Sequence, residues 1–573
     1  MDIYQSLRAE VIAIAHEILG ADIDTKNVTV EPPKDKAHGD LSSNAAMVLA
    51  KAAGRKPREL AEEIANKAQG IDIVNNIDVA GPGFLNFFMT PSSIQSVVAD
   101  VLKQGEKFGS NNLGKGRRVN VEYVSANPTG PLHAGHMRGA VVGDALAGLL
   151  SAAGYDVTRE YYVNDGGAQV DVLARSVYLR YLEAHGRDVE FPEGTYPGEY
   201  VVELGQAMKA EFGDKFVDAD ENEWLELFRE KGTSAMMKLI ESDLASLGVN
   251  MDTYYSERSL YEGGKIEAAI GFLDKQGLIY EGTLPPPKGK ELEDWEARIQ
   301  TLFKSTEHGD DVDRPIKKAD GAWTYFAPDI AYHFDKIERG YDELIDVLGA
   351  DHGGYVKRMQ AAVRALSVGK VELDVKLCQL VKLFKNGEPF KMSKRAGNFV
   401  LLSDIIEEVG PDVARFVVLM RKPDAPLDFD FDKVKEQSKD NPVFYVQYAH
   451  ARAVSIATKA REEFGDIDLG DADLSLLTTA GELDLIKNLA NYPRLIAAAA
   501  EAHEAHRVAF YLYDLASDFH ALQHQGKLDD SLRFIMASDR ELSKARLALV
   551  RSVRQVVANG LQILGVSPMD NMR

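Results

Sequence analysis

The sequence predicts an α/β protein whose central part is a doubly wound parallel sheet. Strand-like and helical segments alternate from about residue 119, which is the pattern of a parallel sheet with crossover helices. After about residue 403 the pattern becomes almost wholly helical. A separate small α/β segment precedes both, and 573 residues are too many for one hydrophobic core. We therefore expect a Rossmann-like domain between a small α/β N-terminal domain and an all-α helical-bundle C-terminal domain.

The bulk composition is that of an ordinary globular protein, with 45% hydrophobic and 27% charged residues. No window approaches the roughly 18 apolar residues that span a bilayer, and the start lacks the pattern of a signal peptide. The single cysteine, Cys378, excludes an intramolecular disulfide and a cysteine-rich zinc site. We expect a cytoplasmic protein. The net charge of −23 predicts that any contact with nucleic acid is confined to local basic patches.

Residues 1–112 form the first predicted domain. Helical patterns cover Tyr4–Leu19, Leu41–Ala53 and Pro57–Ala68, and residues 71–89 have strand character. The run at 109–118 is rich in glycine, asparagine and basic residues, which is typical of a linker.

Residues 113–402 form the second predicted domain. VNVEYV from Val119 is a predicted strand, HAGHMRGAVVGDALAGLLSAAG a helix, and YDVTREYYV a second strand. Polar, poorly periodic sequence from about 186 to 232 indicates an insertion. Strand-like segments return at 343–348 and 371–384. The remaining residues, 403–573, contain long amphipathic helical patterns and form the third predicted domain.

The segment 131–139, PLHAGHMRG, places His133 and His136 in the first turn of a predicted helix. At this spacing the two side chains share one face. Free N–H groups at a helix N-terminus attract anions, and imidazole donors beside them suit a nucleoside triphosphate. Gly135 would allow a close approach of an adenine ring. Two histidines at the start of a surface helix are the simpler interpretation when the segment is considered alone.

The segment 384–399, FKNGEPFKMSKRAGNF, carries four basic residues among glycine, asparagine and proline. It predicts an exposed loop. A flexible basic loop can close on a departing pyrophosphate and stabilise charge in the transition state. A solvated basic turn is the alternative.

Considered together, HAGH at 133–136 and KMSKR at 391–395 resemble the HIGH and KMSKS motifs of class I aminoacyl-tRNA synthetases. Their order and the helical C-terminal region agree with that class. The segments 121–139, 159–169, 324–336, 348–358 and 440–452 resemble arginyl-tRNA synthetases of the bacterial type, and 32–52 is similar to that family's additional N-terminal domain.

The resemblance implies an arginine–tRNA ligase that activates L-arginine with ATP and transfers it to the 3′ end of tRNA(Arg). A guanidinium is planar and permanently charged, and carboxylates hold it best. A buried carboxylate left unpaired by a rival amino acid gives discrimination of roughly 10⁴–10⁵, so no editing domain is required. By resemblance, Glu122 and Asn127 bind the α-amino and carboxylate groups of arginine, Tyr325 and Asp329 bind the guanidinium, and Tyr332 lines the pocket. A helix N-cap is the other interpretation of Asp329.

The resemblance also implies roles on the ATP side. The catalytic candidates are His133, His136, Lys391 and Lys394. The candidates for the nucleoside region and the rest of the ATP site are Gly135, Asp351, His352, Met392 and Ser393. Mg²⁺ should arrive with ATP, and no structural metal is expected.

The tRNA contacts are expected outside this domain. GFLNFF at 83–88 places Phe84 and Asn86 on one face of a predicted strand, where an aromatic ring can stack on an unpaired base. By resemblance this domain binds the tRNA elbow, although core packing competes as an explanation of Phe84. Tyr448 and Arg452 are candidates in the helical region, which resembles an anticodon-binding domain. The resemblance implies a monomer.

Three other functions stay open from the sequence. A different class I synthetase, glutamyl or cysteinyl, is the nearest, although one cysteine disfavours the zinc site of the cysteinyl type. The second is a non-catalytic RNA-binding paralogue, which the retained histidines and lysines argue against. The third is a small-molecule nucleotidyltransferase, which would have little use for the helical C-terminal region.

Overall fold

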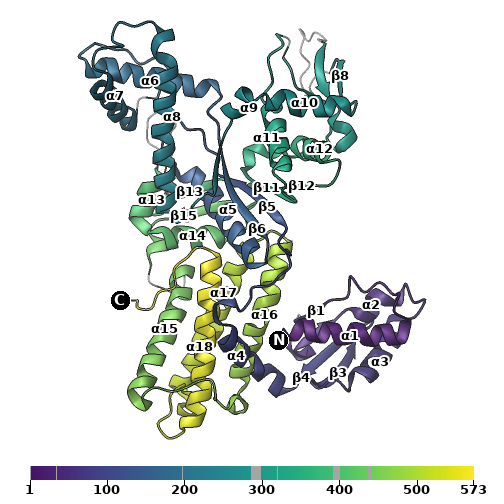
Figure 1. Ribbon diagram of the computed structural model, residues 1–573. Coiled ribbons are helices and arrows are strands. Elements are labelled where there is room, and N and C mark those ends of the chain that lie inside the picture. The colour runs from purple at the N-terminus through teal and green to yellow at the C-terminus, as the bar shows by residue number, and fades with distance from the viewer. Residues whose placement is uncertain are drawn as a thin grey trace. The chain divides into compact units, whose positions relative to one another are not determined.

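The structure is a computed structural model, and it describes residues 2–572 apart from 34, 197, 285–298, 319, 391–399, 437 and 439–440 (Figure 1). The chain forms two compact units, each described by itself. Residues 1–111 and 437–573 make one unit, and residues 112–436 make the other. Among the described residues, no helix combines the length and apolar character that crossing a membrane requires.

The N-terminal segment is a four-stranded antiparallel sheet with helices, in the strand order β1-β2-β4-β3. Its elements are α1 (Ile3–Leu19), β1 (Val30–Glu31), η1 (Lys36–His38), β2 (Leu41–Ser43), α2 (Ala45–Ala50), α3 (Pro57–Ala68), β3 (Val74–Ala80), β4 (Phe84–Met89), α4 (Pro91–Gln104) and η2 (Gly105–Lys107). The prediction of a helix over Leu41–Ala53 is wrong for its first residues. Residues Leu41–Ser43 pair with β4 instead, so tertiary pairing overrides the local helical pattern.

The second unit contains the predicted parallel sheet, in the order β12-β11-β5-β6-β7. Its strands are β5 (Arg118–Tyr123), β6 (Asp156–Val163), β7 (Thr253–Ser256), β11 (Glu343–Gly349) and β12 (Glu372–Cys378). All four strand pairs are parallel, which confirms the predicted fold class. The strand predicted over 371–384 is two strands, because β13 (Val381–Lys385) belongs to another sheet.

Successive residues of β5 point to opposite faces of this sheet. Tyr123 faces α5 (Ala134–Ala152), where its hydroxyl donates to Asp144 over 3.3 Å. Glu122 faces α11 (Phe326–Glu338), where it pairs with Lys336. The two helices therefore cover opposite faces of the sheet.

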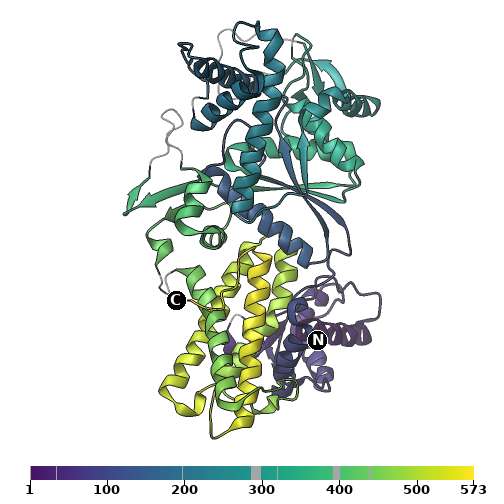
Figure 2. The ribbon, with the colours of Figure 1, turned by 60° about the vertical axis from the view of Figure 1, so that its left-hand side comes forward.

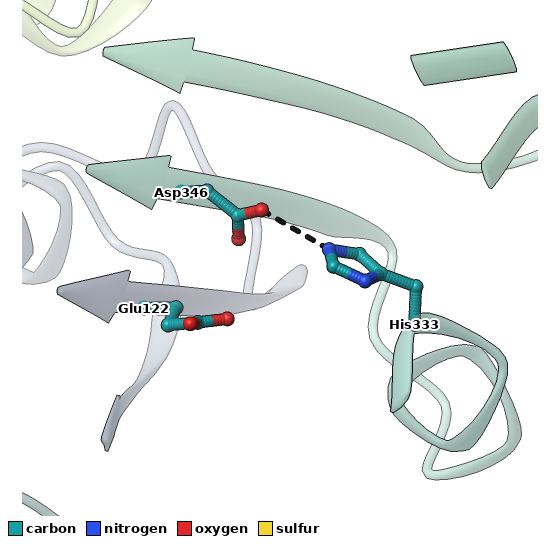
Figure 3. Close-up of side chains that lie close together, drawn as sticks. All are labelled: Glu122, His333 and Asp346. Atoms are coloured by element: carbon teal, nitrogen blue, oxygen red, sulfur yellow. Dashed lines mark hydrogen bonds and ion pairs between the residues drawn. The ribbon is translucent and has the colours of Figure 1, made fainter. Parts of the chain in front are cut away.

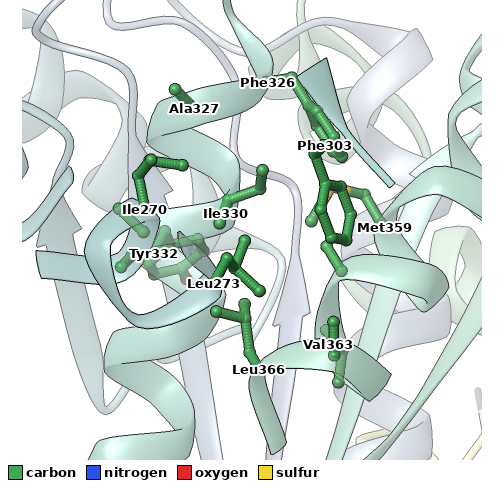
Figure 4. Close-up of a cluster of buried hydrophobic side chains, with 14 of the residues drawn as sticks. Ile270, Leu273, Phe303, Phe326, Ala327, Ile330, Tyr332, Met359, Val363 and Leu366 are labelled. Atoms are coloured by element: carbon green, nitrogen blue, oxygen red, sulfur yellow. The ribbon is translucent and has the colours of Figure 1, made fainter. Parts of the chain in front are cut away.

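One side of α11 packs into an apolar core (Figure 4). Ile330 and Tyr332 of α11 pack with residues of two neighbouring helices, including Leu273 and Leu366. The elements around this core are α9 (Arg258–Glu262), α10 (Lys265–Lys275), β8 (Ile279–Gly282), β9 (Gln300–Phe303), η3 (Ser305–His308), β10 (Arg314–Pro315), η4 (Ala350–Tyr355) and α12 (Val356–Ser367). Burial of this apolar side is what fixes the polar side of α11 against the sheet.

The insertion expected at 186–232 contains regular helices. They are α7 (Glu199–Phe212) and the first part of α8 (Glu221–Ser246), which pack on α6 (Ala168–Ala184). The buried positions of α8 recur every four residues, from Trp224 to Leu244. One buried residue in every four gives a weaker periodic signal in the sequence than the wider apolar face of an ordinary amphipathic helix. This explains why the sequence pattern was poorly periodic.

Residues 402–436 belong to the same unit as the parallel sheet. They contribute strand β15 (Leu427–Asp430) to a small sheet in the order β14-β13-β15, so the region after residue 403 is not wholly helical. Strand β14 (Glu388–Pro389) precedes them, and the other elements of this stretch are α13 (Leu402–Val409), α14 (Pro411–Leu419) and η5 (Lys433–Lys435).

The C-terminal residues form a helical bundle, as predicted (Figure 2). Its elements are α15 (Pro442–Phe464), η6 (Leu474–Leu476), α16 (Ala480–Glu501), α17 (His506–Leu528), η7 (Asp530–Leu532) and α18 (Arg540–Ile563). Helix α4 of the N-terminal segment packs against α16 and α18. Inside the bundle, Arg546 and Glu482 form a buried ion pair of 2.7 Å.

Candidate active site

The polar side chains of the second unit gather where the parallel strands end. In a doubly wound sheet, ligands bind at the carboxyl ends of the strands. Glu122 is near the end of β5, and Glu257 directly follows β7. Val124 and Ser125, which continue from β5, both have positive φ, of 71° and 40°. Backbone of this kind is costly for a β-branched residue and clusters at functional sites.

The two histidines form a closed arrangement at the start of α5. His133 is the N-cap, and its Nδ1 accepts a hydrogen bond from the backbone N–H of Gly135 over 3.1 Å. Nδ1 of His136 accepts from the backbone N–H of His133 over 3.2 Å, and the two ring centroids are 3.9 Å apart. A neutral ring whose Nδ1 accepts carries its proton on Nε2. The predicted pairing of both histidines at a helix N-terminus is therefore present.

The chain after the KMSKR segment lies directly beside these histidines. The N–H of Ala134 donates to the carbonyl of Val400 over 3.0 Å, and the N–H of Leu402 donates to that of Leu132 over 2.9 Å. The four predicted loop residues lie outside the described residues; they are Lys391, Met392, Ser393 and Lys394. These hydrogen bonds join the residues that follow the KMSKR segment to the HAGH segment, although the two are far apart in sequence.

Three carboxylates stand in a row across the sheet. Glu122 on β5 is directly opposite Glu160 on β6 and also directly opposite Asp346 on β11. All three side chains are buried. Helix α11 supplies their partners, and Lys336 donates to Glu122 over 2.6 Å. We call Glu160, Glu122 and Asp346 the carboxylate row.

Asp329 lies in the first turn of α11 and is not the N-cap, which is Tyr325. Its carboxylate accepts a hydrogen bond of 2.6 Å from the hydroxyl of Tyr355. Burial, with the negative charges of Glu122 and Asp346, raises the pKa of the Asp329 carboxyl to about 6, although the hydrogen bond from Tyr355 opposes the shift. A raised pKa of this kind marks the carboxyl as a candidate for a functional role.

Tyr325 and Tyr332 lie in very different surroundings. Tyr325 is 84% exposed. Tyr332 is buried, and its hydroxyl donates to Glu160 over 2.7 Å. Its ring packs against Tyr162 and Tyr255, so it supports the carboxylate row from the side of α11.

Glu257 is a residue that the sequence analysis missed. It is 7% exposed, and its Oε2 finds no hydrogen-bond partner within the part of the chain that the structure describes. Burial, followed by the charges of Asp329 and Asp165, raises the pKa of Glu257 to about 7. A Cβ at Gly166 would come within 3.3 Å of its carboxyl carbon, so that glycine makes room for it. Glu257 and Asp329 thus form a pair of carboxylates with raised pKa values.

Comparison with known proteins decides the family. The chain is 62% identical to the "Arginine--tRNA ligase" of Ruegeria pomeroyi, over 100% of both chains. Three family descriptions match along the chain: "Arginyl tRNA synthetase N terminal domain" over 2–89, "tRNA synthetases class I (R), catalytic domain" over 97–192, and "DALR anticodon binding domain" over 446–572.

The chain belongs to the arginyl-tRNA synthetase family.

Solved structures agree with this assignment. A structure described as a putative arginyl tRNA synthetase from Campylobacter jejuni is 33% identical, with a TM-score of 0.72, and covers 84% of this chain and 100% of its own. The Thermus thermophilus arginyl-tRNA synthetase, 19% identical with a TM-score of 0.75, covers 100% of both chains and supports the fold alone. A class I synthetase uses ATP, so a nucleotide site belongs in this unit.

The remaining predicted residues of this synthetase's active site are more exposed. The side-chain amide of Asn127 donates to Gln169 over 2.6 Å. Asp351 and His352 lie in η4, which follows β11, and pair with each other at 3.6 Å. Both are largely exposed at the same edge of the sheet as the strand ends.

Glu122, His333 and Asp346 are close enough together to hold a metal ion (Figure 3). The ammonium of Lys336 already lies among them, 2.6 Å from Glu122 and 3.3 Å from Asp346. A metal ion would compete with this built-in cation, so the donor set does not suit a resident metal.

The four predicted tRNA contacts lie in the other unit. Phe84 on β4 is 40% exposed, as a stacking residue requires. Asn86 lies on the same strand face as Phe84, but it is only 4% exposed, and its Oδ1 accepts a hydrogen bond from the hydroxyl of Ser42. It is therefore less available for contact with RNA than the sequence suggested. On α15, the guanidinium of Arg452 lies 4.3 Å from the ring of Tyr448 and donates to His520.

Proposed function

We propose that Asp329 and Glu257 bind the substrate guanidinium of this arginine–tRNA ligase. The observation that supports the proposal most strongly is their shared electrostatic state. Both carboxyls have pKa values raised by burial and by negative neighbours, and Oε2 of Glu257 finds no partner among the described residues. A permanently charged guanidinium offers several donors and would satisfy both groups.

The same pair accounts for discrimination. Lysine offers a smaller cation with other geometry, and a neutral amino acid would leave both carboxyls without a cationic partner. An unpaired buried polar group is the strongest means of rejecting a rival substrate. Tyr325 is exposed at the N-cap of the helix that carries Asp329, and we infer that it closes against the bound side chain.

At the other end of the substrate, Glu122 accepts hydrogen bonds from the α-ammonium group and Asn127 contacts the carboxylate. Glu122 is buried at the end of β5, and Asn127 follows the turn in which Val124 and Ser125 have positive φ. This places the substrate carboxylate toward the start of α5. The proposed contacts therefore orient arginine before the chemistry begins.

In the first step a carboxylate oxygen of arginine attacks the α-phosphorus of ATP. The bond to the bridging oxygen breaks, and arginyl-adenylate and pyrophosphate form. His133 and His136 donate to the phosphates beside the N–H groups that begin α5, and Gly135 leaves room for the adenine ring. Lys391 and Lys394 contact the pyrophosphate, while Asp351, His352, Met392 and Ser393 complete the ATP site. Mg²⁺ bound to ATP would neutralise phosphate charge.

In the second step a ribose hydroxyl of the 3′-terminal adenosine of tRNA attacks the arginyl carbonyl, and AMP leaves. We infer that Phe84 stacks on an unpaired base of the tRNA elbow and that Asn86 supports it. Tyr448 and Arg452 contact the anticodon. We further propose domains at 1–112, 113–402 and 403–573, a monomeric state and a cytoplasmic location.

Aminoacylation of total tRNA, with each of the twenty amino acids supplied in turn, tests this function. We expect charging with arginine alone. Charging with another amino acid would overturn the assignment of Asp329 and Glu257. No charging by folded protein with active tRNA would favour a non-catalytic RNA-binding function.

A further inference from the structure

The carboxylate row places like charges directly opposite one another on three neighbouring strands. Glu160, Glu122 and Asp346 occupy paired register positions, and all are buried. Two carboxylates that share a buried site cannot both stay ionised without a cation, and like charges in cross-strand pairs destabilise a sheet. The row therefore requires counter-charges from the helix that covers it.

Helix α11 provides these counter-charges at a spacing of three residues. His333 lies 3.0 Å from Asp346, and Arg339 donates to Glu160 over 2.6 and 2.8 Å. Lys336 lies between them along the helix. Residues three apart share one helical face, so the three basic side chains face the row together.

Lys336 is the cation that serves two members of the row. It is 0% exposed and donates to Glu122 over 2.6 Å and to Asp346 over 3.3 Å. The other oxygen of Glu122 accepts from the hydroxyl of Ser125 over 3.0 Å. Lys336 and Ser125 together fix the plane of the Glu122 carboxylate.

We propose that Lys336 is a positioning residue for the α-ammonium group of the amino-acid substrate, acting by fixing the direction of the Glu122 carboxylate beside Asp346 through its hydrogen bonds to both. The inference rests on the proposed role of Glu122 as the acceptor of that group. Without Lys336, the Glu122 carboxylate would lose the cation that lies between it and Asp346, and like charges would face each other across the two strands. Glu122 would then accept the substrate's ammonium group in a less defined direction.

The test separates the two ends of the substrate. Arginine has an α-ammonium group, whereas 5-guanidinopentanoate has the same guanidinium and carboxylate but no α-ammonium. We would measure the dissociation constants of both ligands by calorimetry with wild-type protein and with Lys336→Met. In Lys336→Met we expect the dissociation constant of arginine to rise by at least about tenfold, because a buried charge pair has lost one partner. The dissociation constant of 5-guanidinopentanoate should change by less than about twofold.

Lys265→Met is the matched control. Lys265 on α10 forms an ion pair of 2.6 Å with Asp335, which neighbours Lys336 on α11. The described hydrogen bonds of the Lys265 ammonium go to Asp335 and Tyr255 and not to Glu122. The control should leave the affinity ratio of the two ligands unchanged. Lys336→Arg retains a cation in a bulkier form and should give a smaller loss, of about three- to tenfold, again for arginine alone. That variant decides the question if Lys336→Met does not fold.

Equal weakening of both ligands, or no weakening of either, would overturn the inference. Glu122→Gln distinguishes this failure from failure of the proposed function. If Glu122→Gln leaves the ratio of the two affinities unchanged, Glu122 does not bind the α-ammonium group, and the proposed roles of both Glu122 and Lys336 are wrong. If Glu122→Gln lowers the affinity for arginine relative to that for 5-guanidinopentanoate but Lys336→Met does not, only the role of Lys336 is wrong. Restoration of arginine binding to Lys336→Met by added Zn²⁺ would show that the cluster is a metal site instead.

Discussion

The raised pKa values of Asp329 and Glu257 make a quantitative prediction about arginine binding. A guanidinium binds the ionised form of each carboxyl, and the pKa values are about 6 for Asp329 and about 7 for Glu257 before the ligand arrives. Both pKa values lie above the usual range for carboxyls, so protonation competes with the ligand as the pH falls. The affinity for arginine should therefore be greatest near pH 8, where the substrate's α-ammonium group is still protonated, and decrease through the window from about pH 7.5 to 5.5.

The size of this decrease follows from the two pKa values. At pH 6, Glu257 is ionised in about one molecule in eleven and Asp329 in about one in two. If both must be ionised, arginine should bind roughly 20-fold more weakly at pH 6 than near pH 8. Near pH 6.5 the two groups together hold about one proton, which binding should release.

Isothermal calorimetry of arginine in buffers with different ionisation enthalpies measures both the affinity and the number of protons released. Glu257→Gln should remove most of the pH dependence and leave about a twofold effect at pH 6 from Asp329. An affinity that is constant from pH 6 to 8, with no release of protons, would refute the assignment of these carboxyls to the guanidinium.

Three further predictions concern the motif, the fold and the RNA. His136→Ala should lower kcat for aminoacylation by about 10²–10³ while arginine binding measured by calorimetry stays unchanged, because the lost donor acts on the phosphates in the transition state; a large change in arginine affinity would contradict this. Glu482→Gln should lower the free energy of unfolding by roughly 3–5 kcal/mol in urea titrations, because it leaves a buried Arg546 without its charged partner, and a change below about 1 kcal/mol would argue against that ion pair. Phe84→Ala should weaken tRNA binding by about 5- to 100-fold through loss of base stacking and leave arginine binding unaffected, whereas Phe84→Tyr should retain most of the affinity.

The sequence was sufficient for the features that depend on local pattern. Alternating strands and helices predicted the parallel sheet, and HAGH predicted a helix that begins with paired histidines. Asp329 was identified as a candidate from the TYFAPDIAYHFDK segment by its family resemblance. Each of these signals lies within one short stretch of chain.

The features that the sequence could not reveal depend on strand register and on short elements. The carboxylate row is formed by residues on three strands that are distant in sequence, so only the pairing of β5, β6 and β11 brings them together. Glu257 follows β7, a strand of four residues after a helix of 26, and so short a strand leaves little periodic signal. Leu41–Ser43 became a strand because β4 pairs with it.

The central claim is that Asp329 and Glu257 recognise the charge of the substrate guanidinium. Citrulline tests it most directly, because its ureido group has nearly the same shape but no charge. We predict that the wild-type protein prefers arginine to citrulline by at least about 10³ in kcat/KM for aminoacylation. In the double variant Asp329→Asn, Glu257→Gln, arginine should lose most of this advantage while the low activity with citrulline is unchanged or higher. A double variant that retains the full preference for arginine would contradict the account.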